Sequence, residues 1–366
     1  MKALRVTSVD RRARASAFMV EIRRQIKRLM DKGFAYATAS GVYFDVRRFP
    51  EYGKLSKQNV GDLRSGWRIE LDNQKKDPLD FALWKFTKAN DAVSWPASWG
   101  RGRPGWHIED TAITEKILGQ QYDLHGGGID LQFPHHECEI AQAEALSGKK
   151  PFVKIWMHVG VVMVDNEKMS KSAGNSVTIR EFMQKYPVNV LRFTLVSVHY
   201  RSPLHYTVSF AEQSLAALQT IENFLYTLDF IASVGPGKAI AVRPLVRQSL
   251  DHARAAFIRA MDDDFNTPEA LGVLFSLINN YQKKLWELDP VEVTAVRHFL
   301  LKKCAHFGLL FKTAVIPASI RVLAQKREAL RAARDFASAD GLRLKIEAQG
   351  YILEDTPLGP LIKFKI

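Results

Sequence analysis

Two lysines and two hydroxyl groups fall within five consecutive positions of the segment EKMSKSAGN, residues 167–175. Lys168, Ser170, Lys171 and Ser172 form this cluster. Closely spaced ammonium groups and hydroxyls can stabilise the negative charge that develops on transferring or leaving phosphates. Most short clusters of this kind are solvated surface turns, so the neighbouring segments must decide between the two interpretations.

The segment HGGG, residues 125–128, is a second candidate for chemistry. Gly126, Gly127 and Gly128 have no Cβ atoms, so their backbone could approach a ligand closely, although a tight turn would explain them equally well. They end a predicted strand, QYDLHGGG, and ligands of open parallel sheets bind at the carboxyl ends of strands. Asp130 follows two positions later.

The segment HHECE, residues 135–139, could hold a metal ion. His135 and Glu139 lie one turn apart on a predicted helix and share a face, and Asp110, expected near the end of another strand, could be a third ligand. A surface ion pair is the commoner meaning of this spacing. Cys138 could contribute as well, but a small buried side chain is the favoured interpretation for Cys138 and for Cys304.

Alternating strands and helices predict the fold that positions these segments. We expect strands at WHI (106–108), at QYDLHGGG and over residues 152–164, with helices ending at Gly119 and spanning 134–148. This alternation is typical of a parallel, doubly wound sheet. The HGGG segment and the lysine cluster each follow a strand of that sheet.

Upstream of this region, apolar residues recur at helical spacing from Phe18, and Gly33 stops the pattern, which predicts an amphipathic helix. Alternation over residues 42–46 indicates a mixed α/β region up to Trp84. The stretch WPASWGRGRPGW suggests a module boundary near Gly100.

Downstream of the lysine cluster, Thr178 and Glu181 stand in capping-box register and begin a helix. Helical patterns over residues 208–311, interrupted by a Gly/Pro linker at 233–244, predict a helical bundle. A basic helix over 326–350 and a short β-like tail are expected to follow.

The composition is that of a globular protein with more than one module. The chain has 366 residues, more than the roughly 250–300 at which single cores stop growing. Lys and Arg outnumber Asp and Glu by 52 to 39, and the net charge of +13 favours a polyanionic partner such as nucleic acid. Solubility alone is the other explanation for this charge.

The sequence also predicts where the protein is found. Two cysteines argue against a disulfide framework and for a reducing compartment. No apolar run reaches the roughly 18–20 residues of a membrane span, and no secretory signal is recognisable at the start. We therefore expect a cytoplasmic protein with no membrane partner.

Taken in order, the motifs resemble one family. KMSKS is the second signature of class I aminoacyl-tRNA synthetases, and from about Arg14 to its end the chain resembles the cysteinyl-tRNA synthetases. The segments that carry the resemblance are RPGWHIED, YDLHGGGIDLQFPHHECEIAQAE, WMHVGVVMVDNEKMSKSAGN, HYRSPLHYT, MDDDFNTPEAL and ARDFASADGLRLKIEAQGYILEDTP.

The resemblance implies an α/β fold with an incomplete class I synthetase Rossmann-like parallel sheet, an all-α helical bundle and a small C-terminal anticodon-binding region. The implied domains are a partial connecting insertion (1–99), the second half of the Rossmann-like catalytic domain (100–160), the KMSKS loop and stem-contact region (161–207), the helical bundle (208–311) and the anticodon-binding region (312–366).

The resemblance also implies a reaction. In this family ATP with Mg²⁺ and cysteine give cysteinyl-adenylate and pyrophosphate, and the cysteinyl group is then passed to tRNA(Cys). A zinc ion coordinates the substrate thiolate and so distinguishes cysteine from serine. The implied partners are tRNA(Cys), cysteine and ATP, and a monomer is expected.

Individual roles follow from the matching positions. Trp106, His125 and Asp130 would bind cysteine, and the backbone of Gly126, Gly127 and Gly128 would lie against the adenylate. Lys168 and Lys171 would be the catalytic groups that bind the ATP phosphates, with Lys171 the stronger candidate.

His135 and Glu139 match two zinc positions, and Asp110 stands where the family usually has cysteine. Because oxygen is a harder ligand than sulfur, we expect weaker zinc binding. The residues expected to reach anticodon bases, by stacking and hydrogen bonds, are Arg331, Phe336, Asp340 and Asp355.

The sequence departs from the family at its start. The HIGH signature is absent, and the nearest text, HVGV (158–161), lies on another strand and lacks the last histidine. We therefore expect that an N-terminal segment is missing, that this chain alone is incomplete for catalysis, and that a fragment supplied in trans could complete it. A non-catalytic tRNA-binding protein is the main alternative. A ligase joining cysteine to an amino sugar is disfavoured by the C-terminal region.

Overall fold

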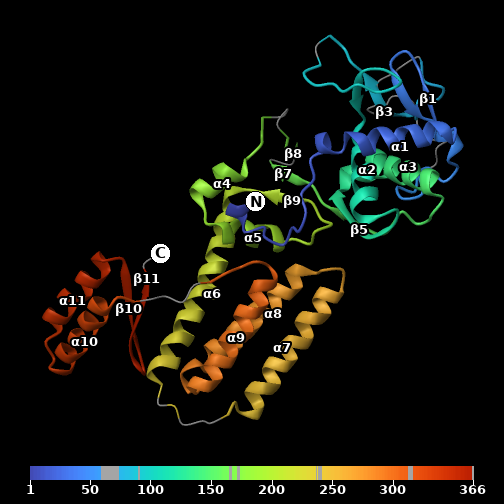
Figure 1. The fold of residues 1–366 in the computed structure, drawn as a ribbon. Helices are drawn as coiled ribbons and strands as arrows, with labels where there is room; N and C mark the ends of the chain where they lie inside the picture. Colours follow the sequence, from blue (N-terminus) through green and yellow to red (C-terminus); the bar gives the residue numbers. More distant parts are fainter. Residues whose placement is uncertain are drawn as a thin grey trace. The chain divides into compact units, whose positions relative to one another are not determined.

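The computed structural model describes residues 1–58, 74–89, 91–164, 167–170, 174–235, 237, 241–311 and 316–364. The chain forms two compact units (Figure 1). One unit is Val6–Val161, and the other joins Met1–Arg5 to Val162–Ile366. Short 3₁₀ turns also occur among the described residues, at Lys2–Leu4, Ala15–Ala17, Val46–Arg48, Ile129–Leu131 and Leu285–Glu287.

Helix α1 (Met19–Asp31) confirms the predicted amphipathic helix of the first unit. Ile22, Ile26 and Leu29 repeat at helical spacing and are fully buried, whereas arginines and lysines occupy the other faces. After the helix, Gly33 takes a φ of +73°, a conformation that glycine adopts without strain.

A four-stranded antiparallel sheet packs in the same core as α1. Its strands are β1 (Ala35–Ala37), β2 (Gly41–Phe44), β3 (Phe81–Phe86) and β4 (Gly102–Pro104), in the order β1-β2-β3-β4. Strand β4 pairs with β3 across the segment that contains Gly100.

Helix α2 (Trp106–Leu118) corrects the strand expected at WHI. Pro104 and Gly105 end β4, and the buried side chains that follow are Ile108, Thr111 and Ala112, which repeat at helical spacing. The three residues of WHI do not distinguish a strand from a helix, and the periodicity of the longer segment decides. Asp110 therefore lies on a helix, not near a strand end as expected.

The predicted strand QYDLHGGG and the helix after it are confirmed. Strand β5 (Tyr122–Gly128) pairs in parallel with β6 (Val153–Val159). Between them lie a 3₁₀ turn (Ile129–Leu131), a π-helical turn (Gln132–His136) and helix α3 (Glu137–Ser147). Helices α2 and α3 pack against α1, so one core joins them to the antiparallel sheet.

The apolar run over residues 152–164 is two strands, not the single strand expected. After β6, the chain leaves the strand at Gly160 and Val161, and β7 (Val162–Val164) belongs to the second unit. There β7 lies between β8 (Glu167–Lys168), which is antiparallel to it, and β9 (Leu204–Tyr206), which is parallel.

Helices dominate the second unit, as predicted. Helix α4 (Ile179–Lys185) begins with the expected capping box of Thr178 and Glu181, and α5 (Val188–Val196) follows. The bundle consists of α6 (Val208–Val234), α7 (Pro244–Asp262), α8 (Thr267–Gln282) and α9 (Pro290–His306). Within the described residues, no helix combines the length and the apolar character that crossing a bilayer requires.

The C-terminal region contains two helices where one basic helix was expected. They are α10 (Ala318–Ala332) and α11 (Phe336–Ala348), and the hairpin β10 (Tyr351–Thr356) and β11 (Gly359–Phe364) follows. The break occurs because Arg334 takes a φ of +63° and the Asp335 carboxylate accepts a hydrogen bond from the Ser338 N–H at 3.1 Å, which caps α11.

Candidate functional site

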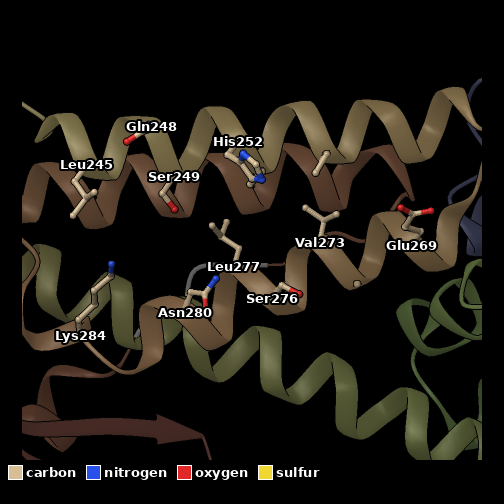
Figure 2. A pocket seen from close by; sticks show the side chains of 13 residues that line it. Leu245, Gln248, Ser249, His252, Glu269, Val273, Ser276, Leu277, Asn280 and Lys284 are labelled. Atoms are coloured by element: carbon tan, nitrogen blue, oxygen red, sulfur yellow. The ribbon is translucent and has the colours of Figure 1, made fainter.

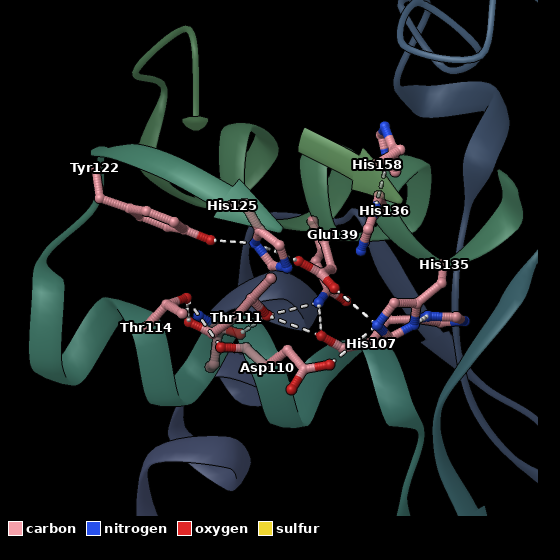
Figure 3. Close-up of polar contacts among 12 residues, drawn as sticks. His107, Asp110, Thr111, Thr114, Tyr122, His125, His135, His136, Glu139 and His158 are labelled. Carbon is pink, nitrogen blue, oxygen red and sulfur yellow. Dashed lines mark hydrogen bonds and ion pairs between the residues drawn. The ribbon is translucent and has the colours of Figure 1, made fainter. Parts of the chain in front are cut away.

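Three segments bring Asp110, His135 and Glu139 together (Figure 3). Asp110 comes from α2, His135 from the π-helical turn, and Glu139 from the first turn of α3. His135 Nε2 lies 3.0 Å from Asp110 Oδ2 and 2.8 Å from Glu139 Oε1. A single N–H cannot point well at both oxygens. The structure thus gathers the three residues that the sequence predicts as metal ligands.

Glu139 is fully buried, and the described residues offer its carboxylate no hydrogen bond of good geometry. Its neighbours on α3 differ in this respect. Glu137 accepts hydrogen bonds from the N–H groups of Leu55 and Ser56 at 3.1 and 2.9 Å. Glu144 accepts one from a lysine at 2.5 Å and one from a backbone N–H at 3.0 Å. Because an uncompensated buried carboxylate is costly, Glu139 needs a cation beside it.

His135 is the nearest cationic group to Glu139. Burial raises the pKa of Glu139 to about 7, against the opposing effect of His135. Burial lowers the pKa of His135, but its contacts with Asp110 and Glu139 outweigh this and raise that pKa to about 9. Burial, and then His135, lower the pKa of His107 to about 3. Charged His135 therefore donates its Nδ1–H to neutral His107, whose Nδ1 lies 2.6 Å away.

These donors fit a divalent cation. The imidazole nitrogen and the two carboxylate oxygens of Asp110, His135 and Glu139 lie within 4.8 Å of one another, and zinc accepts such ligands. The buried carboxylate of Glu139, without hydrogen bonds, is the observation that supports the fit most directly. His107 would hold the His135 ring in one tautomer, as the outer partners of zinc-binding histidines do. A second group of His125, His136 and Glu139 meets the same distance limit.

Cys138 is part of neither group among the described residues. It is fully buried, and its Sγ lies 3.3 Å from the hydroxyl of Tyr52. Cys304 is buried in the core of the helical bundle. Both cysteines are free and have the small buried side chains that the sequence favours.

An aromatic cluster covers one face of β5 and β6. His125 and Trp156 are register partners, and their rings stack with centroids 4.7 Å apart. The ring of His136 packs against both at 4.8 Å, and its Nδ1 lies 2.8 Å from Nε2 of His158. The Tyr122 hydroxyl lies 2.6 Å from Nδ1 of His125. Burial, more than neighbouring charge, lowers the pKa of His125 and of His136.

Trp106 and His125 both border the Glu139 site. The Trp106 ring lies 4.1 Å from the ring of His135 between centroids, and 56% of the residue is exposed, so its free face can contact a ligand. His125 Nδ1 lies 3.6 Å from Glu139 Oε2. Asp130, in the turn after β5, is exposed. The two predicted pocket rings therefore lie beside the predicted metal ligands.

The three glycines of HGGG differ in what surrounds them. A Cβ on Gly127 would lie 2.6 Å from a ring carbon of His136, so only glycine fits there. On Gly128 it would lie 2.5 Å from a carboxylate oxygen of Asp130. On Gly126 the nearest atom would be the Met157 carbonyl oxygen at 3.8 Å. Packing thus explains Gly127, whereas the atom near Gly128 belongs to the exposed side chain of Asp130, which can turn away. Gly126 leaves its backbone open to a ligand.

Several residues of the site were not predicted: His107, Tyr122, His136, Trp156 and His158. Trp156 and His158 reach it because β6 pairs with β5 in one particular register, which the sequence alone does not specify. The adjacent histidines of HHECE were the one available signal for His136.

In the second unit, Lys168 is exposed on β8, and Lys171 lies outside the described residues. The side chain of Asn175 contacts the start of the lysine cluster. Its Oδ1 accepts a hydrogen bond from the Ser170 N–H at 2.9 Å, and its Nδ2 donates to the Lys168 carbonyl at 3.4 Å. Asn175 thus links the described residues on either side of positions 171–173, within the segment 168–175 that we call the lysine loop.

The four predicted anticodon-binding residues lie in the C-terminal region. Arg331 on α10 and Asp355 on β10 are brought together, with Arg331 Nη1 3.6 Å from Asp355 Oδ2. Phe336 and Asp340 are exposed and lie one turn apart on α11, so they share a face.

A groove of about 720 Å³ lies between α7 and α8 (Figure 2). Small residues, among them Ala253, Ala256, Gly272 and Ser276, line this groove and leave space that larger side chains would fill. None of the predicted site residues that the structure describes lines this groove.

Comparisons with known protein families agree with the geometry. Residues 1–216 match the family described as tRNA synthetases class I (C) catalytic domain. Residues 256–312 match the DALR domain. The first match covers more than half of the chain, including every residue of the Glu139 site.

The chain is also similar to curated proteins over nearly its whole length. It is 40% identical to a cysteine-tRNA ligase from Caldicellulosiruptor saccharolyticus over 364 residues, 98% of this chain and 78% of the relative. It is 43% identical to a cysteine-tRNA ligase from Chromohalobacter salexigens over 366 residues, 96% of this chain and 76% of the relative.

Among solved structures, the fold is similar to that of Mycobacterium tuberculosis methionyl-tRNA synthetase in complex with methionyl-adenylate. The TM-score is 0.56 at 15% identity, with 84% of this chain and 74% of that chain covered. At this identity the likeness concerns the fold alone.

Substituting Asp110→Cys should raise the zinc affinity of the purified chain by roughly tenfold or more, because a thiolate is the softer ligand. Competition with a chromophoric chelator measures this. Asp123→Cys is the control, because Asp123 is an exposed residue of β5 that pairs with Lys154. Equal zinc affinities for the two variants would contradict the assignment of Asp110 as a ligand.

Proposed function

The chain belongs to the cysteine-tRNA ligase family of class I tRNA synthetases, and on this premise we propose how its residues perform the reaction of the family. In that reaction a carboxylate oxygen of cysteine attacks the α-phosphorus of ATP, and Mg²⁺-bound pyrophosphate leaves. A terminal hydroxyl of tRNA(Cys) then attacks the carbonyl of cysteinyl-adenylate, and AMP leaves. Identity to such ligases over nearly the entire chain is the observation that carries this conclusion.

Cysteine binds where the two pocket rings meet the Glu139 site. Trp106 covers the substrate with its exposed face, and His125 forms the opposite wall, held by the Tyr122 hydroxyl and by stacking on Trp156. Asp130, exposed just after β5, is placed to pair with the substrate ammonium group. These positions are supported by the contacts of both rings with the Glu139 site.

Asp110, His135 and Glu139 hold zinc in this proposal. A zinc ion bound there supplies a soft acceptor for the cysteine thiolate, which the hydroxyl of serine cannot match. His107 keeps the His135 ring oriented, and the buried position of Glu139 keeps water away from its carboxylate.

The adenylate lies along the end of β5. Gly126 leaves its backbone accessible, and Gly127 allows His136 to pack directly against the strand. The neutral rings of His125 and His136 add no charge beside the ligand. The lysine loop then acts on the leaving group, with Lys168 and Lys171 neutralising pyrophosphate as its charge develops.

The C-terminal region binds the tRNA anticodon. Phe336 offers an exposed ring for stacking, and Asp340 follows on the same face of α11. Arg331 and Asp355 place a hydrogen-bond donor beside an acceptor. The net charge of +13 supports binding of a polyanion, and this interpretation now has a named partner in tRNA(Cys).

An additional polypeptide segment packs on the other face of the β5–β6 pair. Leu124, Ile155 and Val159 lie on this face and are 50%, 59% and 43% exposed. Three large apolar side chains on one small sheet are typical of a contact surface. A segment with the HIGH signature, supplied in trans, is the occupant that we propose.

A monomeric state and a cytoplasmic location stay predictions.

Cysteine-dependent exchange of pyrophosphate into ATP tests the reaction. We expect little exchange from this chain alone, and exchange after addition of an amino-terminal segment of a relative that carries the HIGH signature. In the complemented preparation, Lys171→Ala should slow exchange by roughly a hundredfold, because it removes charge stabilisation of the leaving group. Lys185→Ala, at an exposed lysine that ends α4, is the control.

An unchanged rate for Lys171→Ala would remove the role of that lysine. Tight binding of tRNA(Cys) without exchange, even after complementation, would instead favour a non-catalytic tRNA-binding protein.

Substitutions of two neighbouring glycines separate ligand contact from packing. Gly126→Ala should leave the unfolding temperature unchanged, because the nearest atom of this chain to its Cβ would be the Met157 carbonyl oxygen at 3.8 Å. It should weaken binding of a non-hydrolysable cysteinyl-adenylate analogue, because the adenylate is proposed to lie against this backbone. Gly127→Ala should lower the unfolding temperature as well, because its Cβ collides with His136. Calorimetric titration and thermal unfolding of the complemented preparation measure both effects. Wild-type binding by Gly126→Ala would contradict the placement of the adenylate.

A further inference from the structure

Helix α10 carries an arginine on the face that it buries. Ile320, Ala324 and Arg327 occupy successive turns of this face, and Arg327 is only 1% exposed. Ile320 and Ala324 join a small apolar core with Ile346 of α11 and Leu353 of β10. A third apolar side chain would continue that core, so the presence of a guanidinium group requires an explanation.

Arg327 holds the carboxylate of Asp355 through two parallel hydrogen bonds. Its Nη1 donates to Oδ1 at 2.6 Å, and its Nη2 donates to Oδ2 at 3.1 Å. Nη1 also donates to Glu328 at 2.6 Å. Such a fork fixes both the position and the plane of a carboxylate. The hydrogen bonds from Arg327 are the main cause that lowers the pKa of Asp355.

The outer side of the same carboxylate stays accessible. The Asp355 side chain is 49% exposed, although the group that holds it is buried. Each carboxylate oxygen has two lone pairs, and the fork uses one on each, so acceptor capacity is left facing outward. Arg331 Nη1 lies 3.6 Å from Asp355 Oδ2 and is 40% exposed. An acceptor and a donor therefore stand side by side at the surface.

Stability alone explains this arrangement poorly. Burying a guanidinium group costs desolvation, and replacing a buried ion pair with apolar residues is often neutral or stabilising. A buried arginine that grips a half-exposed carboxylate makes sense if the orientation of that carboxylate matters.

We propose that Arg327 is a positioning residue that holds Asp355 in one orientation, so that Asp355 and Arg331 together read the edge of one tRNA anticodon base. This proposal rests on the proposed function, in which Arg331 and Asp355 contact the anticodon. The fixed carboxylate accepts from a ring or amino N–H of the base, and Arg331 donates to the neighbouring oxygen or nitrogen. A base without an N–H at that point leaves the outward lone pairs of the carboxylate without a donor and is rejected.

The test is a set of double-mutant cycles between protein and tRNA. Dissociation constants are measured for full-length chains with a tRNA(Cys) transcript and with transcripts in which each anticodon base is changed in turn. Asp355→Glu retains the ion pair but moves the carboxylate, and Arg327→Lys retains the charge but loses the fork. Glu354→Asp is the matched control, since this neighbour on β10 pairs with Lys363 across the hairpin.

Asp355→Glu and Arg327→Lys should each weaken binding of the unaltered transcript by roughly tenfold or more. At one anticodon position, the same one for both variants, the penalty should vanish when the base is changed. Glu354→Asp should stay within about twofold of the wild type for every transcript.

Three outcomes would overturn the proposal or its premise. Equal penalties with every transcript would make Arg327 purely structural and overturn the proposal. If the penalty of Asp355→Glu vanishes at one changed base but that of a folded Arg327→Lys does not, Arg327 does not position Asp355 for base recognition. Wild-type binding that is insensitive to every anticodon change would refute the anticodon contacts of the proposed function instead. If Arg327→Lys does not fold, Asp355→Glu decides, because the proposal requires that moving the carboxylate relative to the Arg327 fork carries a penalty that vanishes at one changed base.

Discussion

A buried carboxylate without hydrogen bonds, that of Glu139, is the constraint on which the site depends. Folding takes this group out of water and leaves it facing two imidazoles, at 2.8 Å from His135 and 3.6 Å from His125. Such burial is tolerated only when positive charge compensates it. The proposed ligand set of Asp110, His135 and Glu139 follows from this need, and Trp106 and His125, the proposed substrate rings, contact the same residues.

Other buried polar side chains of helix α3 fix neighbouring segments through their hydrogen bonds. Glu137 holds the turn at Leu55 and Ser56, and Glu144 holds Lys54. Gln142 donates to the His107 carbonyl at 2.5 Å, which ties α3 to the start of α2, where Trp106 and Asp110 lie. One helix thus aligns the turn that contains Lys54, Leu55 and Ser56 with the proposed metal ligands and the proposed pocket.

Much of this arrangement could be predicted from the sequence, and the misses have physical causes. Helical periodicity and capping residues sufficed for α1 and α4, and spacing sufficed to pair His135 with Glu139. The strand predicted at residues 106–108 was wrong because three residues, of which Trp106 and Ile108 are apolar, fit the spacing of a strand as well as that of a helix. Strand β6 was extended too far because Gly160 is the only signal of its end. Trp156, His158 and Arg327 were missed because strand register and buried ion pairs arise from tertiary packing.

X-ray absorption at the zinc K-edge of the chain loaded with one equivalent of Zn²⁺ tests the central claim most directly. If Asp110, His135 and Glu139 hold the metal, the first shell contains only nitrogen and oxygen, at about 2.0–2.2 Å, with the outer-shell scattering of an imidazole. A sulfur scatterer at about 2.3 Å, or a first shell without imidazole, would contradict the account, because the metal would then lie on a cysteine or away from Glu139.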